Sequence, residues 1–391
     1  MKNNFGIYTV NGIAYTDKIQ AILEASRTKT AISWDYHQSM FKKINWWEEP
    51  EQSLDELYKI RAHQIRDAYD YVVVMFSGGA DSSNVVHSFL SNNIKIDEIV
   101  SSIPESGLRD WKVSTDTSPE NNASEWILTT LPKLNKIKTD HPEIKISIND
   151  FFKTMLEYKP DEWLYQSGDW LHPSAVARYK LDQLTHLKDL AEQGKRIALI
   201  YGNEKPFLSL YRGMIVSSIW DLGTNTPRQP FDFAYPNVDN ILFYSAPELP
   251  QIHAKQSHII AKIMYLPENK HILAQCKDLE GNYTQEEKNA FSFQNSVFQR
   301  AIVPYIYPSI NMVNVFQAHK ADHVFMASHD EWFYKYHMST KTYEMIKSDF
   351  FNFYKTIDRG YMSKIRLGFQ NFANHYTIGE ARKFEAFARP L

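Results

Sequence analysis

The chain has 391 residues and a mass of 45.7 kDa, and its formal net charge of -3 argues against a protein that binds nucleic acid through its overall charge. Apolar residues make up 43% and charged residues 23%, which excludes a disordered, collagen-like or low-complexity chain. Cys276 is the only cysteine, so the chain cannot form an internal disulfide, a paired-cysteine zinc or redox site, or an iron–sulfur cluster.

The first part of the chain, residues 1–65, is expected to be a short N-terminal leader region. It carries weak strand and helix signals at residues 6–10, 17–25 and 30–34. Apolar side chains then recur near a 3.6-residue period, which predicts an amphipathic helix over residues 54–69.

The next part alternates between strand and helix patterns. Strands are predicted at residues 71–76, 94–103, 143–148 and 196–201, and helices at residues 81–91, 122–136 and 174–193. Such alternation predicts an α/β fold, in which a parallel sheet carries helices on both faces. After residue 206 the alternation fades, and we expect a second, mainly helical accessory or substrate region at residues 211–391.

The loop at residues 77–83 reads Ser-Gly-Gly-Ala-Asp-Ser-Ser and joins the best strand to a helix. Glycines let backbone N–H groups approach a ligand, and the amino end of the helix favours a polyanion. Asp81 would repel phosphate unless it holds a divalent cation, so the loop indicates a metal-bound phosphate chain. The alternative is an ordinary helix cap after a glycine turn. No lysine stands at the Walker A spacing, so simple γ-phosphoryl transfer is not indicated.

The loop resembles the SGGxDS signature of the PP-loop ATP pyrophosphatases, a family that includes asparagine, GMP and NAD synthetases. The resemblance covers about residues 65–205, and it implies an ATP-binding domain at residues 66–210 with a PP-loop, Rossmann-like sheet. A looser similarity to asparagine-synthetase-like proteins of the kind carried by tailed bacteriophages rests on residues 202–206, 243–250 and 255–256.

The resemblance implies a role for each matching position. The expected pyrophosphate-binding residues are Ser77, Gly78, Gly79, Ser82 and Ser83. Asp81 would bind Mg²⁺. Those expected near adenine or ribose are Ser101, Ser102 and Ile103. Gly202, at the end of the fourth predicted strand, is a further expected cofactor-binding residue. Glu204 could share the metal and Lys205 could neutralise the α-phosphate, unless this pair is only an exposed turn. Lys255 could bind phosphate or a substrate carboxylate, unless its segment is only a loop leading into a helix.

The implied activity is that of an AMP-forming ligase that uses ATP and Mg²⁺. It would adenylate a carboxylate or amide oxygen and release pyrophosphate, and an amine or ammonia would then attack. The single cysteine disfavours the thiolating members of the family, and Lys2 stands where asparagine synthetase has its glutaminase cysteine, so ammonia would be free or come from a partner.

Alternatives from other classes remain open. One is a catalytically silent ATP-binding scaffold. Another is an enzyme that modifies nucleic-acid bases through the basic, ring-rich stretch at residues 359–389, although an amphipathic helix explains that stretch as well. His319 and His323 are spaced to share a metal on one helix face, but packed histidines are the simpler reading. The cysteine usage, the lack of a signal-peptide core and the lack of a long apolar stretch predict a cytoplasmic protein without membrane contact.

Overall fold

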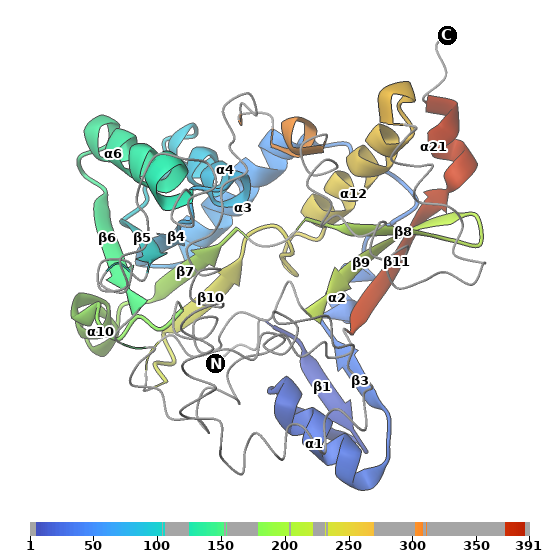
Figure 1. Ribbon diagram of the computed structural model, residues 1–391, viewed down its shortest axis with the longest axis horizontal. Helices are drawn as coiled ribbons and strands as arrows, with labels where there is room; N and C mark the ends of the chain where they lie inside the picture. Colours follow the sequence, from blue (N-terminus) through green and yellow to red (C-terminus); the bar gives the residue numbers. More distant parts are fainter. Residues whose placement is uncertain are drawn as a thin grey trace.

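In the computed structural model the described residues are 5–103, 105, 125–151, 154, 179–202, 205–221, 231, 234–269, 302–307, 310 and 372–387. They build three β-sheets, which we name A, B and C in chain order (Figure 1). Sheet B has five strands, and sheets A and C have three each.

Sheet B is parallel throughout, which confirms the predicted α/β fold. Its spatial order is β10-β7-β4-β5-β6. The strand bounds are β4 Tyr71–Met75, β5 Glu98–Ile103, β6 Lys145–Asp150, β7 Ile197–Tyr201 and β10 Val238–Leu242. Residues 72–74 and 197–200 are fully buried, which is why these two strands read as continuous apolar runs rather than as an alternating pattern.

Helices flank this sheet. Their bounds are α3 Leu54–Ala68, α4 Ala80–Leu90, α6 Leu131–Asp140 and α10 Thr185–Glu192. A capping box starts α3, because Ser53 accepts from the backbone of Glu56 while the Glu56 carboxylate accepts from the backbone of Ser53. Helices α3 and α4 pack on each other and on β4, as Figure 1 shows in blue.

The strand order creates a switch point between β4 and β7. From β4 the chain continues to β5 and β6 on one side, and it then returns to β7 on the other side of β4. Open parallel sheets bind ligands beyond the carboxyl ends of their strands at such a point. Segments that follow β4 and β7 therefore meet where a ligand site is expected.

Three elements in and around sheet B differ from the sequence-based expectation. The predicted helix over residues 174–193 is wrong for residues 179–184, which are not helical, because side chains of neighbouring segments hold this backbone: Asn149 donates to the Lys180 carbonyl at 2.9 Å. Strand β10 was not predicted, and it lies beyond the expected boundary at residue 210 while completing the sheet. The predicted helix over residues 122–136 is a π-helix, η1 Glu125–Thr130, that continues into α6.

Sheets A and C lie on the other side of the molecule. Sheet A has β1 Ile7–Val10, β2 Ile13–Tyr15 and β3 Ile32–Asp35, and α1 Lys18–Thr28 packs on it. Sheet C has β8 Phe207–Tyr211, β9 Met214–Trp220 and β11 Ala373–Glu380, covered by α12 Gln251–Met264 and α21 Ala381–Phe387 (Figure 1, right). Two short elements are α2 Gln38–Phe41 and η2 Pro267–Asn269.

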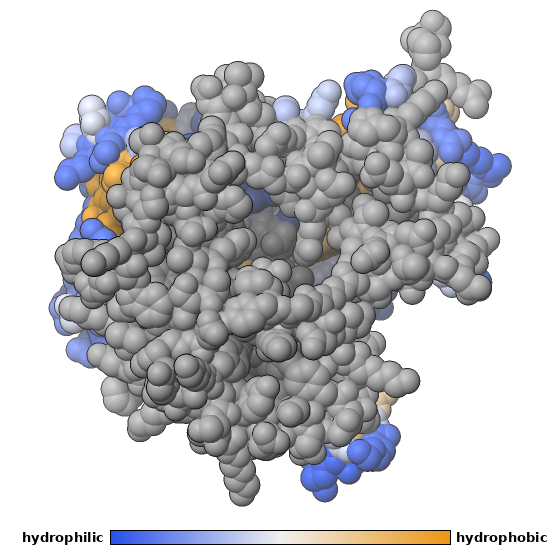
Figure 2. Space-filling view, viewed as in Figure 1, coloured by the Kyte–Doolittle hydropathy of each residue, from blue (hydrophilic) through white to orange (hydrophobic). Residues whose placement is uncertain are grey.

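Apolar surface is visible at the edge of sheet B, where α6 and β6 lie (Figure 2, left). Ile148 of the edge strand β6 is 37% exposed and Leu131 of α6 is 38% exposed. None of the helices among the described residues combines the length and the apolar character needed to cross a membrane.

Two buried histidines of α12 make stability depend on pH. Burial lowers the pKa of His253 to about 3 and that of His258 to about 4, whereas an unfolded histidine titrates near 6.5. Below pH 6.5 the unfolded chain binds more protons than the folded chain. We therefore expect unfolding free energy to fall by about 1.4 kcal/mol per pH unit for each histidine between pH 6.5 and 4.

Urea unfolding at several pH values measures this slope. His253→Gln should remove about half of the histidine contribution, since the second histidine remains. An identical slope in the variant would contradict the assignment to His253.

Candidate functional site

The loop at residues 77–83 lies at the carboxyl end of β4, at the switch point. The backbone N–H of Phe76 donates to the Val100 carbonyl at 2.8 Å, which extends the pairing of β4 with β5 up to the loop. Gly79 occupies the N-cap of α4 and contributes no side-chain hydrogen bond. The first-turn N–H groups of α4 therefore have no side-chain cap, which leaves this helix end suited to an anion.

The loop serines hold the loop itself. Ser82 is buried, and its Oγ donates to the Gly79 carbonyl at 3.3 Å and accepts from the backbone N–H of Ser77 at 3.3 Å. Ser83 Oγ donates to the Gly78 carbonyl at 3.2 Å. The hydroxyls expected to bind pyrophosphate thus shape a compact turn around the amino end of α4.

The segment where η1 meets α6 donates hydrogen bonds to the loop from outside it. Thr130, where η1 meets α6, donates through Oγ1 to the Ser77 carbonyl at 2.6 Å. Lys133 of α6 donates through Nζ to the Gly78 carbonyl and, at 3.0 Å, to Ser83 Oγ. Sequence reasoning missed both residues, because nothing in their local pattern distinguishes them from an ordinary amphipathic helix.

Gly78 is required at this contact. Its φ of +78° is in the left-handed region, and an added Cβ would lie 2.7 Å from both Cα and Oγ1 of Thr130. Gly12 has nearly the same φ, +77°, but an added Cβ there would meet nothing within 4 Å. We expect Gly78→Ala to cost about 1–3 kcal/mol more unfolding free energy than Gly12→Ala, because only the first adds a clash to the backbone strain.

Urea unfolding of the two alanine variants measures this difference. Equal losses would contradict the close approach of Gly78 to Thr130.

Asp81 and Lys205 meet across the switch point. Lys205, which follows β7, donates through Nζ to the Asp81 Oδ1 at 2.7 Å and Oδ2 at 2.9 Å. The lysine side chain is 7% exposed and the aspartate side chain 30% exposed. Gly202 allows this approach, since a Cβ there would lie 2.9 Å from the Asp81 carbonyl. The structure therefore brings together Asp81, Lys205 and Gly202, three residues singled out from the sequence.

Tyrosines enclose the Asp81 side of the site. Tyr307 donates to Asp81 Oδ1 at 2.6 Å, and Tyr244 donates to the Asp81 backbone carbonyl at 2.7 Å. Tyr58 packs against both rings. Burial, and then the negative charge of Asp81, raises the pKa of Tyr307, so this phenol stays a neutral donor. Tyr244 could have been found from the segment at residues 243–250, whereas Tyr307 carries no sequence signal.

The end of β5 borders the loop on its other side. Ser101 and Ile103 are buried, and Ser102 is half-buried and accepts from Asn149 Nδ2 at 3.1 Å. These three residues therefore lie at the carboxyl edge of the sheet, on the strand next to β4. Their expected role near adenine or ribose stays a prediction.

Lys255 has partners away from the loop. On α12, its Nζ pairs with Glu49 Oε1 at 2.8 Å and donates to the Pro50 carbonyl at 2.8 Å. The structure therefore does not join Lys255 to Asp81. Glu204 lies outside the described residues, as do His319 and His323.

Of the basic C-terminal stretch, residues 372–387 are described. Arg382 pairs with Glu380, and Lys383 donates to the Trp47 carbonyl at 2.9 Å. These contacts add no support for a nucleic-acid surface.

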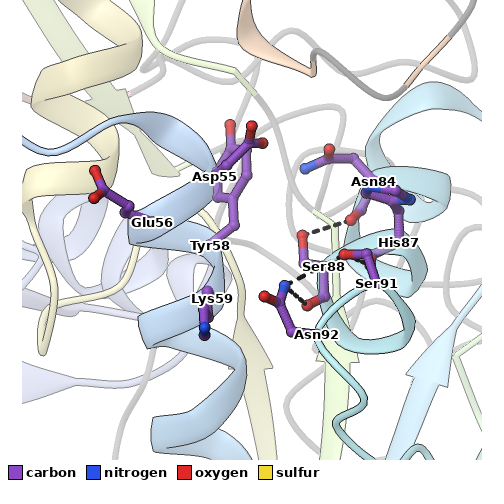
Figure 3. Close-up of a pocket in the computed structure, with 9 residues that line it drawn as sticks. All are labelled: Asp55, Glu56, Tyr58, Lys59, Asn84, His87, Ser88, Ser91 and Asn92. Atoms are coloured by element: carbon purple, nitrogen blue, oxygen red, sulfur yellow. Dashed lines mark hydrogen bonds between the residues drawn. The ribbon is translucent and has the colours of Figure 1, made fainter.

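A groove of about 580 Å³ runs between α3 and α4 (Figure 3). Tyr58 and Asn84 point into it, whereas Glu56 points away. It is lined by Asp55, Glu56, Tyr58, Lys59, Asn84, His87, Ser88, Ser91 and Asn92. Asn84 donates to the Tyr244 hydroxyl at 3.1 Å, and Tyr58 packs against Tyr244 and Tyr307, so the groove adjoins the site through these residues.

Asp81 is the carboxylate available to a metal at this loop. Within the described ranges, no three histidine, cysteine, aspartate or glutamate side chains gather as a metal cluster. Mg²⁺ in nucleotide sites commonly needs only one or two carboxylates, because phosphate oxygens and water complete its shell. A carboxylate offers about four acceptor positions, and three contacts from Lys205 and Tyr307 occupy part of them. Asp81 therefore fits a metal that arrives with a phosphate chain.

Together these contacts define a site of an uncapped helix end, a carboxylate, a buried ammonium and two phenols at one switch point. Its parts come from four separate segments of the chain. In the comparisons with known proteins, no family model, no curated protein and no solved structure matches this chain.

Proposed function

We propose that the protein binds ATP with its triphosphate at the loop of residues 77–83 and transfers the AMP moiety to an acceptor oxygen. The acceptor is a carboxylate or an amide, and the product of the second step is an amide or a related nitrogen compound. With a single cysteine in the chain, we propose a cytoplasmic location for this reaction.

The Asp81–Lys205 pair is the observation that carries the proposal. A carboxylate and an ammonium 2.7 Å apart join the segments after β4 and β7, beside the uncapped amino end of α4. The helix end suits the β- and γ-phosphates, and the ammonium suits the charge that develops on the α-phosphate. A structural ion pair would not need an uncapped helix end next to it.

Asp81 would hold Mg²⁺ bound to the phosphate chain, and the metal would supply charge neutralisation for the departing pyrophosphate. In the structure the Lys205 ammonium contacts this carboxylate. When Mg²⁺ binds Asp81 in its place, the Lys205 side chain would turn towards the nucleotide. Glu204 as a further ligand stays a prediction.

The first step forms a bond between the acceptor oxygen and the α-phosphorus. The bond from the α-phosphorus to the bridging oxygen breaks, and its electron pair leaves with pyrophosphate. In the second step an amine or ammonia attacks the activated carbon, and AMP departs with the former acceptor oxygen. The loop N–H groups and Lys205 stabilise the charges of the first step.

Product analysis tests the proposal without knowledge of the natural amine. The protein is incubated with ATP, Mg²⁺, a panel of carboxylates and amides, and hydroxylamine as the nitrogen nucleophile. We expect AMP and pyrophosphate to form together with a hydroxamate from a carboxylate acceptor, or with an amidoxime from an amide acceptor. ADP and phosphate as products would contradict the proposal, and binding of ATP without any turnover over the whole panel would favour the silent scaffold.

A further inference from the structure

Two carbonyl groups of the loop are turned towards η1 and α6. The Ser77 carbonyl accepts from Thr130 Oγ1, and the Gly78 carbonyl accepts from Lys133 Nζ and from Ser83 Oγ. A carbonyl oxygen has two lone pairs, so both acceptor positions of Gly78 are in use. The negative ends of these two peptide groups are thereby fixed on the side of α6.

This orientation matters for an anion. A carbonyl oxygen that faced the amino end of α4 would repel phosphate oxygens, whereas an N–H group there attracts them. Gly78 and Gly79 are adjacent, and a peptide between two glycines reverses its direction with little steric cost. Two contacts hold this peptide in its direction: one comes from Ser83 within the loop, and the other comes from Lys133 outside it.

We propose that Lys133 is the positioning residue that fixes the Gly78 peptide for a polyphosphate ligand. Its ammonium holds the Gly78 carbonyl and the Ser83 hydroxyl, and the N–H of Gly79 on the opposite side of this peptide donates only weakly, to Ser77 Oγ at 3.4 Å, so a phosphate oxygen of the nucleotide would replace that acceptor. The inference rests on the proposed function and adds to it a residue from outside the loop. Lys133 is half-buried at this contact, which suits a fixed rather than a mobile role.

Lys136 provides a matched control. It lies one turn further along α6, pairs with Asp140 at 2.6 Å and has a side chain that is 76% exposed. Lys133→Met and Lys136→Met therefore make the same chemical change on the same helix, but only the first removes a contact to the loop. Lys133→Arg retains the charge and donor groups and should restore part of the effect.

Calorimetric binding of three ligands in the presence of Mg²⁺ tests the role: α,β-methylene-ATP, which cannot be cleaved at the α,β position, inorganic pyrophosphate, and AMP. We expect Lys133→Met to weaken the first two by about tenfold and to leave AMP within about twofold, because only the β- and γ-phosphates face the loop. Lys136→Met should bind all three like the unmodified chain.

Three results would overturn the inference. The first is unchanged affinity for all three ligands in Lys133→Met. The second is an equal loss of affinity for all three ligands, and the third is unfolding of both Lys133→Met and Lys133→Gln. Either of the last two would make Lys133 a general structural residue. If the unmodified protein bound neither α,β-methylene-ATP nor pyrophosphate, the proposed function would fail and this inference with it. Normal binding by the unmodified chain with no effect of Lys133 would reject the inference alone.

Discussion

Replacing Asp81 by asparagine is expected to reduce the formation of AMP and pyrophosphate by about a hundredfold or more. The substitution keeps the size of the side chain and removes the negative charge that Lys205 and Tyr307 contact at 2.7 and 2.6 Å. An amide is a far poorer ligand for Mg²⁺ than a carboxylate, so the metal–phosphate complex loses its anchor. Initial rates of pyrophosphate release with and without hydroxylamine measure the loss.

The same substitution leaves a buried ammonium at Lys205, whose side chain is only 7% exposed. We expect a stability loss of about 1–3 kcal/mol for Asp81→Asn alone, since a buried charge loses its partner. The double variant Asp81→Asn with Lys205→Met removes both charges and should regain much of that stability without regaining turnover. Asp67→Asn is the matched control, because it makes the same chemical change at an exposed position of α3 outside the site. Turnover in Asp81→Asn close to that of Asp67→Asn would contradict the assigned role.

The centre of sheet B could be predicted because its local pattern and its environment agree. Residues 72–74 and 197–200 are apolar runs at the centres of β4 and β7, and they are buried on both faces. Strand β10 was harder to recognise because it lies at the edge of the sheet and carries Asp239 and Asn240 within its five residues. A polar pair of this kind breaks the continuous apolar run that identified the inner strands.

The segment before α10 shows why a helix prediction can fail. Residues 174–193 have a helical spacing, yet residues 179–184 are not helical. Their backbone is held by hydrogen bonds that Asn149 donates to the Lys180 carbonyl and Gln183 donates to the Asp150 carbonyl. Ordinary residues differ in helix propensity by only about a few tenths of a kcal/mol each, and such tertiary contacts outweigh this difference. They involve strand β6, more than thirty positions earlier in the chain, and no local window contains them.

The residues of the candidate site also differ in whether a local sequence pattern identifies them. Asp81 and Lys205 were found because both follow predicted strands, and the topology of a parallel sheet brings such ends together. Lys133 and Tyr307 contact the loop from positions 55 and 226 residues away, and neither belongs to a local motif. Only the folded chain places a lysine behind the Gly78 carbonyl.

A second large effect is expected far from this site, at the junction of sheets A and C. Asp221, which follows β9, is fully buried and accepts from Lys18 Nζ at 2.8 Å, the Tyr8 hydroxyl at 2.9 Å and the backbone N–H of Phe372 at 3.1 Å. We expect Asp221→Ala to lower unfolding free energy by about 3–5 kcal/mol, because it removes the buried carboxylate that the buried ammonium of Lys18 contacts. Urea unfolding followed by circular dichroism measures the loss.

Two variants show whether the charge or the hydrogen bonds dominate this junction. Tyr8→Phe removes one hydrogen bond to the carboxylate and should cost about 1.5–3 kcal/mol. Asp140→Ala breaks the exposed pair with Lys136 and should cost less than about 1 kcal/mol, because solvent screens both charges. If Asp221→Ala cost no more than Asp140→Ala, sheets A and C could not be held together by this pair. If Asp221→Ala instead lowers the unfolding free energy far more than Tyr8→Phe does, the buried charge of Lys18 dominates this junction. The single hydrogen bonds to the carboxylate would then contribute less to the contact between sheets A and C.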